Sequence, residues 1–190
     1  MSTFSDLKER FGVNWATVSV GWKGLGVFSL WPGRWKEFHP LVSAKELDDY
    51  ALTRLDKDSD RENIATIISL LSLNLREESG EVICALLDHL SDLEESDPAL
   101  EIRKWRVVLL EQLLEDIPTE PLYGLIAFTD FWNDFGFPSD SPHEVQGRWN
   151  SLGPQEYYTQ ENLERTIQRH QKWVENEIEE IKKTNCAGSS

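Results

Sequence analysis

Apolar residues recur along most of this chain at intervals of three and four, which is the spacing of one face of an α-helix. Residues 43–75 hold two such stretches and residues 79–117 hold two more. Ser43 with Glu46 forms a capping box, Asp60 precedes the second stretch, and Asp97 with Pro98 opens the fourth. We therefore expect helices over residues 44–57, 60–74, 80–93 and 98–117, arranged as two helical hairpins.

The two ends of the chain also have a helical pattern. Ser5 can cap a short helix that ends at Phe11, because Gly12 follows. Thr159 can cap a last helix with a single apolar stripe about five turns long, made of Leu163, Ile167, His170, Val174, Ile178 and Ile181. We interpret His170 as a hydrogen-bonded histidine at the edge of the core. Residues 185–190 are expected to be a disordered tail.

The segment 14–31 permits two interpretations. Val18, Val20 and Trp22 alternate with small polar residues as in a strand, and the glycines after Lys23 could turn a hairpin. Against this, Asn14 is a good helix cap, and Trp15, Val18 and Trp22 share a helical face. We favour a helix, followed by irregular structure over residues 26–40. The tryptophans from Trp15 to Trp35 are either core residues that close one end of a bundle or an exposed binding platform.

These elements predict an all-α protein, with a single helical bundle of six to eight helices over residues 1–184. The middle of the chain, residues 98–117, is apolar on more than one side and is expected to be central. A chain of 190 residues is long enough for one domain with a full core.

The stretch 122–150 combines an aromatic helix with a shaped loop. The helix is expected to start at Thr119 to Pro121, and its aromatic spacing ends at Gly136, before Pro138 and Pro142. The loop presents five residues of interest: Asp140, His143, Glu144, Gln146 and Trp149. His143 could carry a proton or bind a partner, whereas the neighbouring Ser, Pro and Asp are explained by capping and turn formation.

Charge changes this picture most in the middle of the chain. The net charge is −15, and residues 44–120 contribute −12 of it, with 20 acidic against 8 basic residues. Such a surface repels phosphate backbones and anionic lipids and attracts basic protein surfaces. We therefore expect a protein partner, and neither a nucleic-acid nor a membrane partner.

Few residues suggest catalytic chemistry. Asp130 and Asp134 lie four apart on one helical face, and with Asp140 and His143 they could form a metal site for a metal-dependent hydrolase. The alternative, which we favour, is that the two aspartates face water. Cys84 lies in an apolar run and is expected to be buried and unreactive. We predict no catalytic residues, no metal and no cofactor.

The expected location is cytoplasmic. The first twelve residues carry charges of both signs and lack the apolar run of a signal peptide. No stretch approaches the roughly 20 apolar residues of a membrane span. We expect no disulfide between Cys84 and Cys186, because one lies in an apolar, core-like run and the other in the tail.

Two groups of residues carry a resemblance. The first is Asn14, Trp15, Gly21, Trp22 and Lys23; the second follows the motif FW-x-DF-x-x-P-x-DSPH-x-x-QG from Phe131 to Gly147, and continues through Glu156, Tyr157, Tyr158 and Trp173. In these residues the chain resembles a small bacterial family of helical proteins of unknown function. Members of such families are often encoded near polymorphic or contact-dependent toxins, so the resemblance implies an immunity role.

Our hypothesis is an immunity protein that neutralises a toxin domain, expected to be a basic nuclease, through an acidic helical face. The residues predicted to bind this partner lie near helix ends in the middle third: Asp48, Asp49, Asp56, Asp58, Asp60, Glu77, Glu78, Glu94, Glu95 and Asp97. The alternatives are the metal-dependent hydrolase and a helical adaptor without a toxin partner.

Overall fold

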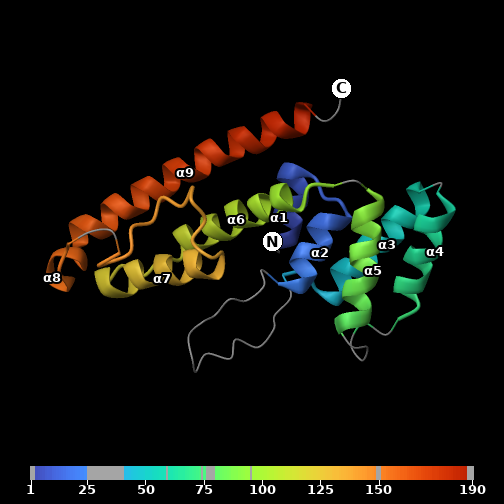
Figure 1. Ribbon diagram of the computed structural model, residues 1–190, viewed down its shortest axis with the longest axis horizontal. Helices are drawn as coiled ribbons and strands as arrows, with labels where there is room; N and C mark the ends of the chain where they lie inside the picture. The colour runs from blue at the N-terminus through green and yellow to red at the C-terminus, as the bar shows by residue number, and fades with distance from the viewer. Residues whose placement is uncertain are drawn as a thin grey trace. The chain divides into compact units, whose positions relative to one another are not determined.

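The structure, a computed structural model, describes residues 3–24, 41–58, 60–73, 75, 80–94, 96–148 and 151–187. In these ranges the chain forms nine α-helices and no strand (Figure 1), which confirms the all-α prediction. The number exceeds the predicted six to eight because Pro154–Tyr157 forms one additional turn of helix, α8, which was not among the expected helices. None of the helices in these ranges is long and apolar enough to cross a bilayer.

The first two helices are α1 (Thr3–Phe11) and α2 (Trp15–Lys23). The cap of α2 decides between helix and hairpin for this segment. The Asn14 side chain accepts the Thr17 N–H at 2.8 Å, and the Thr17 hydroxyl accepts the Asn14 N–H at 3.1 Å. These two bonds satisfy the backbone N–H groups of Asn14 and Thr17 at the start of a helix. In a hairpin, the same kind of group would bond to the neighbouring strand. The predicted irregular segment 26–40 lies outside the described residues.

Three successive helices follow: α3 (Ala44–Lys57), α4 (Arg61–Leu71) and α5 (Gly80–Leu93). The predicted caps form, since Ser43 and Glu46 make a capping box and Asp60 accepts the N–H groups of Glu62 and Asn63. Helix α4 packs against both α3 and α5, and α5 also packs against α2 (Figure 1). The helix starts agree closely with the sequence, while α4 ends three residues before the predicted Asn74.

The described contacts divide the chain into two compact units at Trp105 and Arg106. The boundary falls within α6 (Pro98–Glu115), so this helix supplies residues to both. The prediction of a single domain stays a prediction. In the first unit the core is built around Trp15 and Trp105, and a Cβ added to Gly21 would lie 2.4 Å from Trp105 Cζ2. Glycine at this position therefore allows α2 to approach the Trp105 ring.

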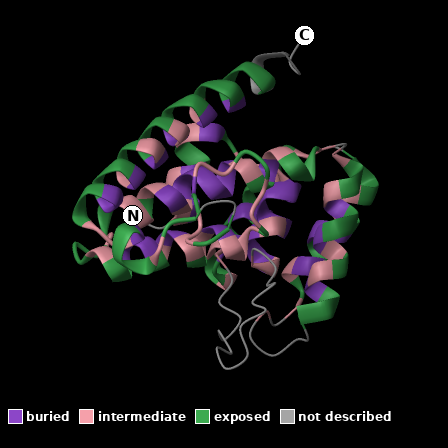
Figure 2. Ribbon diagram, turned by 60° about the vertical axis from the view of Figure 1, so that its left-hand side comes forward, coloured by how far each residue is buried: buried purple, intermediate pink, exposed green. Residues whose placement is uncertain are grey.

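The second unit contains α7 (Pro121–Asp134), α8 and α9 (Gln160–Ala187). Helix α7 packs on α9, where a Cβ added to Gly124 would lie 2.7 Å from Leu163 Cδ1. Positive φ at Gly136 and Phe137 ends α7, as the sequence predicted for this position. Figure 2 shows that α9 carries its buried residues along one side and exposed residues along the other. The helix continues to Ala187, into the predicted tail.

Candidate functional site

The first unit contains a cavity of about 530 Å³. Its wall combines the end of α1, the second half of α3 and the first turn of α4. Three cationic side chains line it, from Lys8, Arg54 and Lys57, together with the carboxylate of Asp58. The only sequence signal for this site is weak, namely basic residues in the last turns of α1 and α3. Nothing in the sequence indicated that these two helices end at one cavity.

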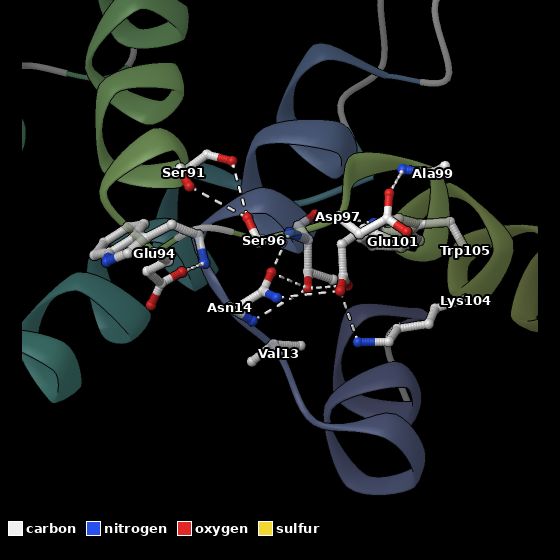
Figure 3. A network of polar contacts seen from close by, with 12 residues as sticks. Val13, Asn14, Ser91, Glu94, Ser96, Asp97, Ala99, Glu101, Lys104 and Trp105 are labelled. Carbon is white, nitrogen blue, oxygen red and sulfur yellow. Dashed lines mark hydrogen bonds and ion pairs between the residues drawn. The ribbon is translucent and has the colours of Figure 1, made fainter. Parts of the chain in front are cut away.

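A buried polar network lies at the start of α2 (Figure 3). Its centre is Glu101 of α6, which is only 1% exposed, and beside it Lys104 is 4% exposed. The Glu101 carboxylate accepts hydrogen bonds from Asn14 Nδ2 at 3.1 Å, Thr17 Oγ1 at 2.5 Å and Lys104 Nζ at 2.8 Å. Because both charges are buried with hydrogen-bond partners, the pair fixes α2 against α6 and is not accessible to a ligand.

Glu94, at the end of α5, connects this network to the cavity. Its carboxylate forms an ion pair with Arg54 and accepts the backbone N–H of Trp15 at 2.5 Å. Arg54 thus has one nitrogen on Glu94 while its side chain lines the cavity. Nearby, the Tyr50 hydroxyl donates to the Val13 carbonyl at 3.3 Å, and burial raises the pKa of this phenol. Glu94 therefore has a structural role in the first unit, where it holds Arg54 and the start of α2.

Seven of the ten predicted partner-binding residues are described; Glu77, Glu78 and Glu95 lie outside the described residues. Several of the seven have local structural roles. Asp58 accepts hydrogen bonds from the Asp60 N–H and from Asn63 Nδ2, and Asp97 accepts the Ala99 N–H at 2.9 Å. On α3, Asp49 is exposed and pairs with Lys45 at 2.7 Å, and Asp56 is exposed. Asp48 is half-buried, and desolvation raises the pKa of its carboxyl.

The loop of interest after α7 is held in place by contacts within the second unit. Asp140 receives both terminal nitrogens of Arg106, at 3.2 and 2.7 Å, and Arg106 also pairs with Glu177 at 3.3 Å. The guanidinium lies over the rings of Trp132 and Trp173, with centroid distances of 5.7 and 4.9 Å. These contacts explain Asp140 as the anchor of the loop.

The next loop residues are also engaged. Glu144 pairs with Arg169 at 2.6 Å, and the Gln146 side-chain amide donates to the Leu152 carbonyl at 3.0 Å. The hydroxyl of Tyr157 donates to the Glu144 carbonyl at 2.5 Å, and burial raises the pKa of Tyr157 to about 12. Trp149, which completes the predicted group, lies outside the described residues.

His143 and His170 are both buried, and their ring centroids are 5.6 Å apart. His170, predicted at the edge of the core, is fully buried: Nδ1–H donates to the Thr166 carbonyl at 2.7 Å, and Nε2 accepts the Trp132 indole N–H at 2.7 Å. His143 Nε2 contacts the Thr129 hydroxyl at 2.8 Å. Since that hydroxyl donates to the Leu125 carbonyl, its oxygen must accept a hydrogen bond from the N–H at His143 Nε2.

This arrangement keeps both imidazoles neutral. Burial is the main cause that lowers the pKa of His143 to about 3 and that of His170 to about 4. The remaining nitrogen, Nδ1 of His143, is buried without a hydrogen-bond partner among the described residues. A general acid or base needs a pKa near the working pH, so these values disfavour the proton-carrier interpretation of His143.

The residues of the metal-hydrolase alternative are all described, and they do not assemble. Across the part of the chain that the structure describes, no three His, Cys, Asp or Glu side chains form a group that could hold a metal ion. Asp140 is bound by Arg106, and His143 by Thr129. The cluster that this alternative requires from Asp130, Asp134, Asp140 and His143 is therefore not formed.

Two further predictions concern buried side chains. Trp15 and Trp22 belong to the core, as one interpretation of the Trp-rich segment held, while Trp31 and Trp35 lie outside the described residues. Cys84 was expected to be buried, but it is partly exposed. Ile83 and Leu87 occupy the core face of α5, and Cys84 stands one position beside it. Burial still raises the pKa of the thiol, which disfavours the reactive thiolate.

Comparison with known proteins places the chain in a family without assigning an activity. No curated protein and no solved structure matches the sequence. The sequence pattern of one family matches residues 5–178, and that family is described as an uncharacterized protein conserved in bacteria. The match includes both described units and supports the predicted resemblance to a bacterial family of unknown function. Because the match covers most of the chain, the chain belongs to this family of bacterial proteins, DUF2247.

Proposed function

We propose that this chain is a cytoplasmic protein-binding protein of the immunity type, and that its surface on α3, α4 and α5 binds a basic toxin domain. The observation that carries the proposal lies on α3. Leu52 is 55% exposed and stands between exposed Asp49 and Asp56, three and four residues away on the same helical face. An exposed large apolar side chain between two carboxylates resembles a protein-binding surface, where apolar contact area is combined with a charged rim.

The neighbouring helices support the same interpretation. Ile68 on α4 and Val82 on α5 are also exposed. Over the described residues of 44–105, three Lys or Arg residues are exposed, against eight acidic ones: Asp49, Asp56, Asp60, Glu62, Glu81, Asp88, Asp92 and Asp97. On α5, Glu81, Asp88 and Asp92 are seven and four residues apart, which is the spacing of one helical face. A partner for this surface is expected to be basic.

The immunity role refines this proposal. Nuclease domains bind phosphate with basic surfaces, and an acidic protein can cover such a surface in place of the nucleic acid. The resemblance to families encoded near toxins points in the same direction. A helical adaptor remains the second candidate, because the same surface could bind a basic partner that is not a toxin.

The test uses the toxin domain encoded beside this chain's gene, if one is present, as the binding partner. Co-expression is expected to restore growth of cells that produce the toxin. In surface plasmon resonance, Asp49→Asn with Asp56→Asn should slow association roughly threefold and reduce its dependence on salt. Leu52→Ala should accelerate dissociation about tenfold, since it removes an apolar contact.

A matched control is available on α9. Glu175→Gln with Glu179→Gln changes the net charge by the same two units, and both residues are exposed in the second unit. This control is expected to bind like the wild type. Equal slowing by both double variants would show that only total charge matters, and would remove the α3 surface from the proposal. Binding without restored growth would support the adaptor instead of the immunity protein.

A further inference from the structure

The cavity in the first unit has the opposite charge to the chain as a whole. The chain has 34 acidic and 19 basic residues, yet Lys8, Arg54 and Lys57 line the cavity against the single carboxylate of Asp58. This concentration of cations is independent of the acidic surface in the protein-binding proposal, which does not use the cavity. It calls for a separate explanation.

The charged groups around the cavity are not equally available to a ligand. The Asp58 carboxylate accepts hydrogen bonds from the Asp60 N–H and from Asn63 Nδ2, both at 3.1 Å, so it is used to join α3 to α4. Arg54 pairs with Glu94 through one terminal nitrogen. Lys8 and Lys57, in contrast, form no ion pair within the described ranges, although Lys45 and Lys183 pair with nearby acidic residues. Two ammonium groups at the cavity therefore have no ion-pair partner among the residues that the structure describes.

Part of this placement has a structural explanation. Lys8 and Lys57 lie in the last turns of α1 and α3, where a cation complements the negative end of the helix dipole. That effect stabilises each helix whether or not a ligand is present. A ligand-binding role makes a different prediction, because it requires both lysines to act on one added molecule.

We propose that this cavity binds a small molecule that carries phosphate groups. Its volume of about 530 Å³ lies in the range of small-molecule sites. An ammonium group is a compact point charge that can donate hydrogen bonds to phosphate oxygens in several directions, and two lysines from different helices can bind adjacent phosphate oxygens. A carboxylate ligand would prefer a bidentate contact with arginine, and one terminal nitrogen of Arg54 is already bound to Glu94.

The test measures binding to the full chain by isothermal titration calorimetry at low salt. Inorganic pyrophosphate is the first probe, ADP tests whether the phosphate groups belong to a nucleotide, and citrate tests a carboxylate ligand of comparable charge. Pyrophosphate is expected to bind one to one. Lys8→Met with Lys57→Met should weaken its binding by about 30-fold or more, since each lysine contributes a charge-assisted contact. Tighter binding of ADP than of pyrophosphate would support a nucleotide as the source of the phosphate groups, and equal binding would support the phosphate groups alone.

The control is Lys45→Met with Lys183→Met, which removes the same charge away from the cavity and should change pyrophosphate binding by less than about twofold. Three results would overturn the proposal: no binding of either phosphate probe at millimolar concentration, equal weakening by both double variants, or citrate binding as tight as that of pyrophosphate. If the cavity double variant does not fold, the single Lys57→Met variant is measured instead, and unchanged binding would also count against the site. None of these results depends on whether the acidic surface binds a protein.

Discussion

Mild acid is the perturbation to which the second unit is expected to respond most strongly. His143 and His170 are buried as neutral imidazoles, with the pKa of each held well below its ordinary value of 6.5. The positive charge of Arg169 acts on both rings and further lowers the pKa of each. The unfolded chain has no such constraint, so its histidines take up protons near their ordinary pKa.

The sign and size of the effect follow from linkage. Between the ordinary and the folded pKa the unfolded chain binds more protons than the folded chain, so stability is full above pH 6.5 and falls as the pH is lowered. Each pH unit is worth about 1.36 kcal/mol for each group. From pH 6.5 to about pH 5 the two histidines together are expected to cost about 4 kcal/mol. That is a large part of the roughly 5–15 kcal/mol that stabilises an ordinary domain.

The assay is urea unfolding followed by tryptophan fluorescence, at neutral pH and at about pH 5. The two histidines should account for about 4 kcal/mol of the stability that the wild type loses between the two conditions. His143→Gln with His170→Gln should therefore lose about 4 kcal/mol less than the wild type, whatever the other groups contribute. His89→Gln, which changes an exposed histidine, should behave like the wild type. If the double variant keeps the full pH dependence of the wild type, the two rings are not the buried neutral groups described here. Should the double variant not fold, His143→Gln alone is expected to remove about half of the dependence.

Three further predictions concern stability and are measured by urea unfolding at neutral pH. Glu101→Ala is expected to cost about 3–5 kcal/mol, because it leaves Lys104 as an unpaired buried charge. Adding Lys104→Met to Glu101→Ala should recover part of this loss, and a cost of Glu101→Ala below about 1 kcal/mol would contradict the buried pair. Gly21→Ala should cost about 1–3 kcal/mol, because its Cβ would lie 2.4 Å from Trp105 Cζ2, while Gly80→Ala, with no atom within 4 Å, should be neutral or stabilising. Arg106→Lys should cost about 1–3 kcal/mol, because it loses the two-nitrogen contact to Asp140 and the stacking on Trp173, and unchanged stability would show that charge alone is sufficient.

Helix starts could be predicted from the sequence because their signals are local. Ser43 and Asp60 cap α3 and α4 as expected, and Thr159 accepts the Asn162 N–H at the start of α9. The segment after Asn14 was ambiguous, because its alternating apolar and polar residues also fitted a strand. The hydrogen bond from the Thr17 N–H to the Asn14 side chain caps the helix and shows which alternative forms. The start of α1 was less accurate, because the helix begins at Thr3, before the predicted cap Ser5.

The candidate sites were harder to predict because they depend on contacts between distant residues. Helix α6 was expected to be central from its apolar pattern, and Trp105, Val107 and Val108 are indeed buried. The same pattern could not show that Glu101 and Arg106 are buried as well. Glu101 meets Thr17 over 84 residues of sequence, and Arg106 meets Glu177 over 71. A charged residue in an amphipathic pattern is ordinarily placed on the solvent side, and only the fold reveals a buried partner.

Some acidic residues of the middle third form structural contacts through their carboxylates, whereas others are exposed. Only the exposed ones are suitable for variants that test binding. Glu94 and Asp97, at first sight good positions for charge reversal, hold Arg54, the Trp15 N–H and the Ala99 N–H. Lost binding after their substitution could therefore reflect a damaged first unit. Within the described ranges the Asp49 carboxylate pairs only with exposed Lys45, a contact that contributes little to stability, and Asp56 is exposed beside Leu52. Their neutralisation is expected to leave the fold intact, so the acidic-surface hypothesis is best tested by the α3 variants.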